Sequence, residues 1–161
     1  MGKPFRLYFH GPFLLGRYPS KEIADLPAAS GIYCVYACDR CAFDKAEPRG
    51  KPLYIGQCGG PRDRKIRDRW HEHEKADLGR KGLIGSEERC YTWARCEEHH
   101  TLSNFLNRIE NAMLVTYKPR FNCNKKSWFG PWSTDTTIEI TGCNVGLEPF
   151  FIHIPAGETR R

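Results

Sequence analysis

Two runs of strand-like sequence, residues 31–37 (GIYCVYA) and 53–57 (LYIGQ), constrain the fold of this chain most strongly. Each run is rich in β-branched and aromatic residues and is bounded by glycine, proline or charged residues, which is typical of paired β-strands. The residues between them, 38–52, are polar and charged and contain Pro48 and Gly50, so they predict a surface loop rather than a tight turn. The sequence therefore predicts a β-hairpin with a long connection.

Alternation within this hairpin places two tyrosines on the same face of a sheet. Because successive side chains point to opposite faces of a strand, Tyr33 and Tyr54 can stand side by side. Val35 and Gly56 share their face. The opposite face is predicted to carry Ile32, Cys34, Tyr36, Leu53 and Ile55. The tyrosine face is then either a packed surface or the floor of an active site.

The length and charge of the chain narrow its class. A chain of 161 residues is long enough for one domain with its own core. It has 25 Lys and Arg against 19 Asp and Glu, and the net charge of +6 favours a polyanionic partner without proving one. The sequence has no secretory signal and no apolar run long enough for a membrane span. We therefore expect a soluble intracellular protein, cytoplasmic or nucleoid-associated, whose eight cysteines are reduced thiols.

Residues 61–78 predict a helix that opens at Pro61 and stops before Gly79. Helical periodicity places Arg69 and His73 beside the packed face of this helix, whereas Arg67 and His71 lie nearly opposite. Arg69 and His73 are therefore the better candidates for a role in a site.

A second helix is predicted from Thr101 or Ser103 to about Tyr117, ending before Pro119. Its apolar stripe comprises Leu102, Phe105, Leu106, Ile109, Ala112, Met113 and Thr116. Glu110 lies on the rim of this stripe, and a half-buried carboxylate needs a partner or a metal. Further strands are predicted at residues 5–9, 91–96, 136–140 and 150–154.

In this order the chain resembles the GIY-YIG nucleases. The matching stretches are residues 31–33 (GIY), 54–56 (YIG), 69–73 (RWHEH), Glu110 and 118–122 (KPRFN). A single tripeptide is weak evidence, whereas all of these elements in sequence are strong evidence.

The resemblance implies an α+β fold, a small GIY-YIG-type domain with a three-stranded antiparallel sheet flanked by helices, here with a short C-terminal β extension. Residues 1–161 are then a single domain. Its nuclease core spans residues 28–126, and residues 1–27 and 127–161 are terminal extensions.

The resemblance also implies metal-dependent phosphodiester hydrolysis. Glu110 would bind one divalent ion, Mg²⁺ or Mn²⁺, and Arg69 would clamp the phosphate through its planar guanidinium. Tyr33 would accept the proton of the attacking water. Free tyrosine titrates near about 10, so Tyr33 would need His73 as a relay. Tyr54 would position water or phosphate.

Asn122 completes the implied site by holding tyrosine or backbone groups in place. The stretch between Gly56 and Arg69 is longer than in compact members of the family, so the choice of Arg69 over Arg64 or Arg67 rests on the helical-face argument. Members of the family often have a basic or polar residue soon after the second motif. Here Gln57 or Arg62 could fill that position.

We therefore predict a DNA endonuclease acting on double-stranded or branched DNA, of restriction, repair or mobile-element type. Cutting both strands from a single-site enzyme predicts a homodimer or sequential nicking. The alternative is a catalytically silent nucleic-acid-binding module. All of these residues also have purely structural interpretations. The tyrosines could pack in a sheet, Arg69 and His73 could form a pair on the helix surface, and Glu110 could make an ion pair.

Two further sequence features each allow two interpretations. Cys38 and Cys41 have zinc-knuckle spacing, which Cys34 or Cys58 could complete, although reduced core thiols are the simpler interpretation. Near the C-terminus, aromatic and basic residues form either a nucleic-acid surface or a packed tail. These residues are Lys125, Lys126, Trp128, Phe129 and Trp132.

Overall fold

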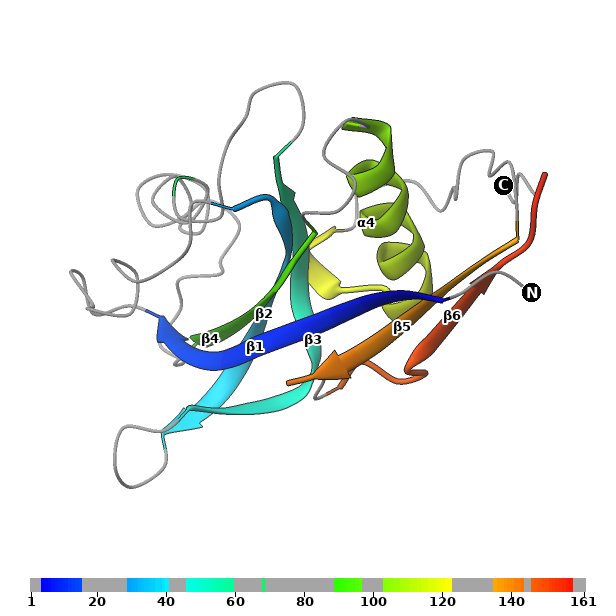
Figure 1. Cartoon of the computed structure of the whole chain (residues 1–161). Coiled ribbons are helices and arrows are strands. Elements are labelled where there is room, and N and C mark those ends of the chain that lie inside the picture. Colours follow the sequence, from blue (N-terminus) through cyan, green and yellow to red (C-terminus); the bar gives the residue numbers. More distant parts are fainter. Residues whose placement is uncertain are drawn as a thin grey trace.

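The computed structural model describes residues 4–15, 29–40, 46–59, 68, 89–96, 103–122, 135–143 and 146–157. Within these residues the chain forms one six-stranded sheet, a long α-helix and a short 3-10 helix (Figure 1). In chain order the elements are β1 (Phe5–Leu15), β2 (Gly31–Arg40), β3 (Ala46–Cys58), β4 (Arg89–Arg95), α4 (Ser103–Tyr117), η2 (Arg120–Asn122), β5 (Thr136–Gly142) and β6 (Phe151–Ile154).

The sheet is mixed, with strand order β3-β2-β4-β1-β5-β6. Only the β1–β5 pair is parallel, and the other neighbouring strands are antiparallel. The predicted fold class, a three-stranded sheet flanked by helices, is therefore wrong. The predicted strands are present as β2, β3 and β4, but they form only half of the sheet. The reason is β1, which pairs with both β4 and β5 and so joins the predicted terminal extensions to the same sheet.

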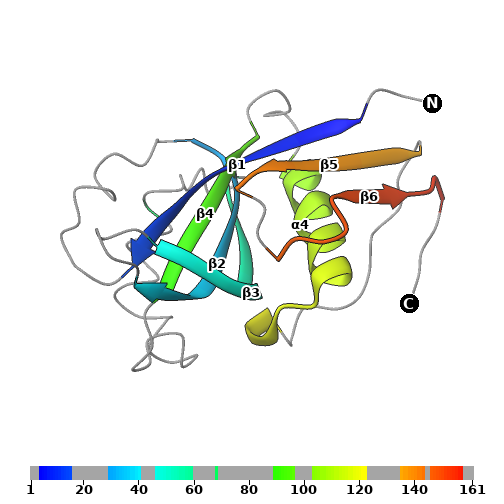
Figure 2. The same cartoon turned by 90° about the horizontal axis from the view of Figure 1, so that it is seen from below.

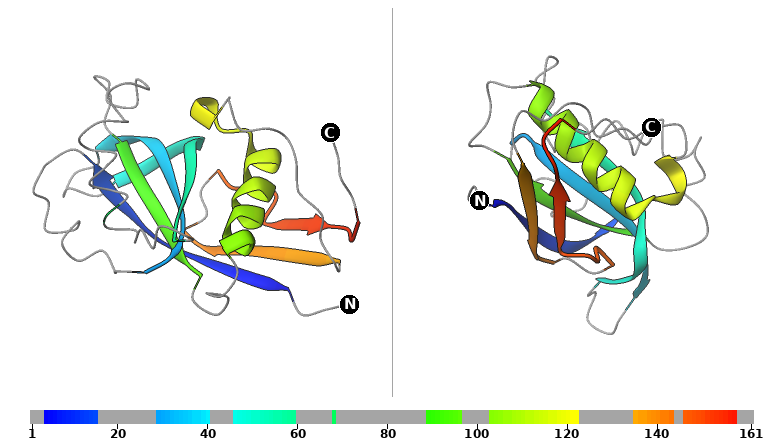
Figure 3. Two further views of the ribbon diagram at one scale, coloured as in Figure 1. Left: turned by 90° about the horizontal axis from the view of Figure 1, so that it is seen from above. Right: turned by 90° about the vertical axis from the view of Figure 1, so that its right-hand side faces the viewer.

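The sheet curls into an open half-barrel, and α4 lies in its hollow (Figures 1 and 2). The helix contacts β3 at one edge of the sheet, β6 at the other edge, and β2 between them. Figure 3 shows the same arrangement from above and from the side, with α4 running across the inner surface of the strands. Among the described residues, no helix is long and apolar enough to cross a membrane.

The inner surface of the sheet and the buried side of α4 form the main core, which we call the helix face. The strands contribute Leu7, Phe9, Ile32, Cys34, Tyr36, Cys38, Ile55, Cys90, Ala94, Ile138, Ile140, Ile152 and Ile154. The helix contributes Leu106, Ile109, Ala112, Met113, Leu114 and Tyr117. These side chains leave water together, and this burial is the main driving force for the curl around α4.

The second predicted helix matches α4 in its bounds and largely in its buried stripe. Lys118, with a φ of 49°, then takes the left-handed conformation common at helix C-termini, and its N–H donates to the Leu114 carbonyl at 3.0 Å. Pro119 follows, and the chain turns back through η2. This turn brings the end of η2 onto β3.

The β2–β3 hairpin is longer than its sequence predicts. The strands continue past a register shift between Val35 and Ala37, and pairing resumes from Ala37 opposite Arg49 to Arg40 opposite Ala46. The predicted loop at 38–52 is therefore mostly strand. Pro48 is tolerated because β3 is an edge strand, where a missing N–H breaks no ladder on the outer side.

Candidate functional site

A second buried cluster lies on the outer surface of the sheet, opposite α4, and we call it the tyrosine cluster. Its buried members are Tyr33, Val35, Tyr54, Cys58 and Tyr91, with Phe13, Leu53, Trp93 and Phe121 packed against them. Tyr33 and Tyr54 share this face, as the alternation of the hairpin predicts. Leu53 does not follow its predicted face, because the register shift next to it interrupts strict alternation.

The rings of Tyr33 and Tyr54 are neighbours, with centroids 6.0 Å apart and planes inclined by 33°. Both lie over Gly56, which is the register partner of Tyr33. A Cβ atom at Gly56 would overlap the Tyr33 hydroxyl and approach Tyr54 Cε1 to 2.8 Å. The glycine of the YIG motif is therefore what allows the two rings to share this space.

The glycine of the GIY motif has a comparable role on β2. A Cβ atom at Gly31 would overlap the backbone carbonyl of Ala94 on β4. Gly31 therefore allows close backbone approach of β2 and β4 at the start of the strand that carries Tyr33.

Asn122 holds the backbone of the YIG motif from the open edge of β3. Its Oδ1 accepts a hydrogen bond from the Ile55 N–H at 2.9 Å, and its Nδ2 donates to the Ile55 carbonyl at 2.8 Å. Its own N–H donates to the Pro119 carbonyl at 3.1 Å, which fixes it within η2. The side chain is buried, so these bonds satisfy polar groups that have little access to water. Asn122 thus fixes the strand that carries Tyr54.

Glu110 of α4 is more deeply buried than its position on the rim of the stripe predicts, with 3% of its surface exposed. The physical reason is the curl of the sheet, which covers α4 from β3 as well as from β6. Asn107, one turn earlier on the same side of α4, hydrogen-bonds Gln57 of β3. This contact indicates that the side of the helix that carries Glu110 faces β3. The Tyr54 ring lies on the other surface of that strand, so the structure places Glu110 and the tyrosine pair on opposite sides of β3.

The tyrosine pair itself forms a packed cluster rather than an open floor. Tyr33 and Tyr54 expose 2% and 4% of their surfaces. Period-two alternation places both rings on one face but carries no information on what covers that face. Tyr91 and Trp93 are neighbours of this pair that were not predicted, although alternation within the predicted strand 91–96 places these two side chains on one face.

Arg69 and His73 lie outside the described residues, as do the alternatives Arg64 and Arg67 and the aromatic and basic residues 125–132. Asp68, next to Arg69, is helical, as predicted for that position.

The cysteines near the hairpin do not assemble a zinc site among the described residues. Cys34 and Cys38 belong to the helix face, whereas Cys58 belongs to the tyrosine cluster on the opposite surface, so Cys58 cannot complete a site with them. Cys41 lies outside the described residues. Within the described part of the chain, no group of three His, Cys, Asp or Glu side chains is placed to hold a metal.

Burial sets the chemistry of the thiols on the helix face. It raises the pKa of Cys34 and of Cys90 well above the ordinary value, and it raises the pKa of Cys96 from 9.0 to about 12. Such thiols stay protonated near neutral pH and are poor nucleophiles and poor metal ligands. They act as small apolar core residues.

No protein family model, curated protein or solved structure matches this chain. Its function must therefore be argued from its own residues and their geometry.

Proposed function

We propose that this protein is a DNA endonuclease of the GIY-YIG type that hydrolyses phosphodiester bonds with one divalent ion, Mg²⁺ or Mn²⁺. One observation carries the proposal. The rings of Tyr33 and Tyr54 are neighbours over Gly56. Asn122 hydrogen-bonds both the N–H and the carbonyl of Ile55, which lies between Tyr54 and Gly56. A purely structural sheet does not need this combination of residues.

The two tyrosines would have different roles toward the attacking water. Tyr33 would accept a proton from the attacking water, and Tyr54 would orient that water or the phosphate. Both tasks require hydroxyl groups whose positions are fixed in advance. The packing of the rings over Gly56 and the anchoring of β3 by Asn122 favour that role.

Glu110 is the proposed metal ligand. Mg²⁺ is often bound by one or two carboxylates together with waters and substrate phosphates, so a single carboxylate fits this chemistry. When bound, the ion would neutralise charge that develops on the phosphate oxygens. Glu110 would contribute from the side of α4 that faces β3. Arg69 would clamp the phosphate, and His73 would take the proton from Tyr33.

The decisive experiment is incubation of supercoiled plasmid with the full-length protein and Mg²⁺ or Mn²⁺. We expect cleavage that EDTA stops and that Glu110→Gln reduces by at least about a hundredfold, the scale for loss of a transition-state charge stabiliser. Glu148→Gln is the matched control, because Glu148 is an exposed glutamate distant in sequence from the motifs, and it should cut normally. Metal-dependent cutting that survives Glu110→Gln would refute this site.

The choice of histidine has its own test. Because the helical-face argument favours His73 over His71, His73→Ala should lose cleavage while His71→Ala keeps most of it. Equal losses in the two variants would show that His73 has no special role in cleavage.

The alternative is a nucleic-acid-binding module without turnover. The near-complete burial of Tyr33 and Tyr54 favours it, since buried rings resemble packing residues more than reagents. It predicts salt-dependent DNA binding without metal-dependent cutting. The same plasmid assay, combined with a binding measurement at several salt concentrations, separates the two functions.

A further inference from the structure

A row of aromatic rings leaves the buried tyrosine cluster and reaches the exposed part of the outer sheet surface. The rings of His10 and Trp93 are stacked, with centroids 4.6 Å apart and planes inclined by 22°. Tyr8 continues the row, with its ring centroid 5.0 Å from that of His10. Tyr8 is 56% exposed, so the row ends on a ring that water can reach.

The strand register connects this row directly to the tyrosine pair. Trp93 lies opposite Tyr33 across the β2–β4 pair, and His10 lies opposite Trp93 across the β4–β1 pair. Neighbouring strands are about 4.8 Å apart, so His10 is roughly 10 Å from Tyr33 at the backbone. One stacked nucleic-acid strand advances about 3.4 Å per nucleotide, so about three nucleotides span this distance.

The exposed charge beside the row is positive. Of the three arginines on β1 and β4, Arg89 is buried and Arg6 is ion-paired with Glu139, so Arg95 is the arginine that the proposal uses. Arg95 is exposed and lies two residues after Trp93, on the same face of β4.

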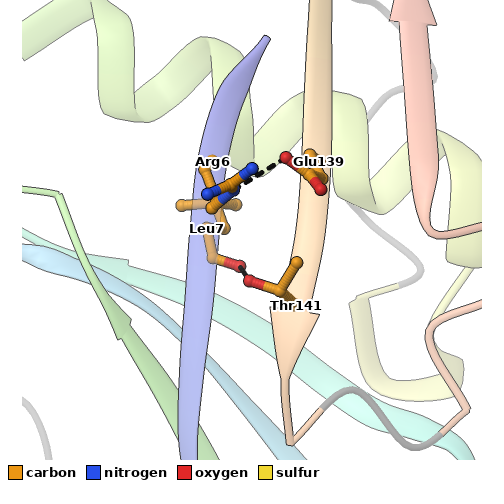
Figure 4. A network of polar contacts seen from close by, with 4 residues as sticks. All are labelled: Arg6, Leu7, Glu139 and Thr141. Carbon is orange, nitrogen blue, oxygen red and sulfur yellow. Dashed lines mark hydrogen bonds and ion pairs between the residues drawn. The ribbon is translucent and has the colours of Figure 1, made fainter.

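An ion pair marks where the row of aromatic rings ends on the side of β5. The Arg6 guanidinium meets the Glu139 carboxylate at 2.7 Å, and Figure 4 shows this ion pair joining the outer sides of β1 and β5. Beyond it, Phe151 of β6 is as exposed as Tyr8, at 57%, but is separated from the row by Glu139, its register partner.

We infer that Tyr8, His10 and Trp93 form a stacking surface for an unpaired nucleic-acid strand that extends from the proposed cleavage site. Every base offers a flat π-face to an aromatic ring, and Arg95 supplies positive charge for the backbone. A duplex hides those base faces within its own stack, so the surface selects single-stranded segments. This inference rests on the proposed function for the position of the scissile bond, and it narrows the substrate to DNA with an unpaired segment.

Binding is measured in EDTA, where cleavage cannot interfere, with a fluorescent oligothymidylate and with a duplex of equal length. We expect Tyr8→Ala and His10→Ala each to weaken binding of the single strand by roughly five- to a hundredfold, the scale for loss of one stacked base. Both side chains are exposed, so these variants should fold. Phe151→Ala is the matched control and should bind as the unmodified protein does.

The outcomes separate the two proposals. Equal weakening by Phe151→Ala, no weakening by Tyr8→Ala and His10→Ala, or an equal loss of duplex binding would overturn the stacking surface. If these variants lose single-strand binding and the protein never cuts DNA, the stacking surface stands and the nuclease proposal fails. If the protein cuts DNA with unpaired segments equally well with and without Tyr8, the nuclease stands and the stacking surface fails.

Discussion

The two faces of the sheet are built from different chemistry. The helix face combines aliphatic side chains and protonated thiols around α4, and it draws on every strand of the sheet. The tyrosine cluster is aromatic, is centred on β2, β3 and β4, and is fixed from the sheet edge by Asn122. The helix face therefore supplies most of the stability, and the outer face carries the two proposed catalytic tyrosines, whereas the proposed metal ligand, Glu110, comes from α4.

Ile109→Ala tests the helix face and should have the largest effect on stability. Ile109 is fully buried between α4 and the sheet, so the truncation should lower the free energy of unfolding by about 2–5 kcal/mol. Urea denaturation measures this change. Val115→Ala on the partly buried side of the same helix is the control and should cost clearly less. Similar losses for both variants would show that α4 is not packed as described.

Asn122→Ala tests how β3, the strand that carries Tyr54, is anchored at the edge of the sheet. It leaves the buried N–H and carbonyl of Ile55 without their partners, which should cost about 1–3 kcal/mol. Hydrogen exchange at the Ile55 amide should accelerate as well. Asn107→Ala removes a hydrogen bond to the Gln57 side chain at an exposed position, so it should cost less. An unchanged exchange rate at Ile55 in Asn122→Ala would contradict the contact.

Alkaline pH should weaken the helix face. Burial raises the pKa of Cys96 from 9.0 to about 12, so the folded protein retains a proton that the unfolded chain releases. The stability that this thiol contributes is complete below pH 9 and is lost as the pH rises toward 12. Thermal unfolding between pH 8 and 11 should show this decline, and Cys96→Ala should flatten part of it. A profile identical in the two proteins would contradict the burial of this thiol.

Tyr33→Phe should have the smallest effect on stability, about 0.5–1.5 kcal/mol, because it keeps the ring and removes only the hydroxyl. It should nevertheless abolish plasmid cleavage. Tyr36→Phe makes the same change three residues later on the helix face and should leave cleavage intact. Loss of activity in both variants, or in neither, would remove the proposed division between the faces.

The periodicity of apolar residues along the sequence predicted those helices and strands that depend mainly on neighbouring residues. Helical periodicity and Pro119 gave α4 close to its bounds, and period-two alternation gave the shared face of Tyr33 and Tyr54. The position of β1 was not predictable, because its pairing with β4 and β5 joins residues far apart in the chain and leaves no local signal.

Parts of the candidate site were predictable from the sequence, and other parts were not. Asn122 was expected to hold tyrosine or backbone groups, and the structure places it on the backbone of Ile55. The depth of Glu110 was missed, because helical periodicity defines a rim only when one side of the helix is covered. The curl of the sheet covers both sides of α4 because β6 reaches it as well as β3, and β6 joins the sheet only through the long-range pairing of β1 with β5.

The central position of β1 has a consequence for how this chain acquires its structure. Phe9 pairs with Ala94 and Phe5 with Ile138, so β1 waits for partners that lie far along the chain. Closing such long loops costs entropy before the contacts form, which slows folding. Until β5 has been synthesised, β1 lacks one of its two neighbours in the sheet. An apolar strand with an unpaired edge is prone to aggregation and is a surface that chaperones can bind.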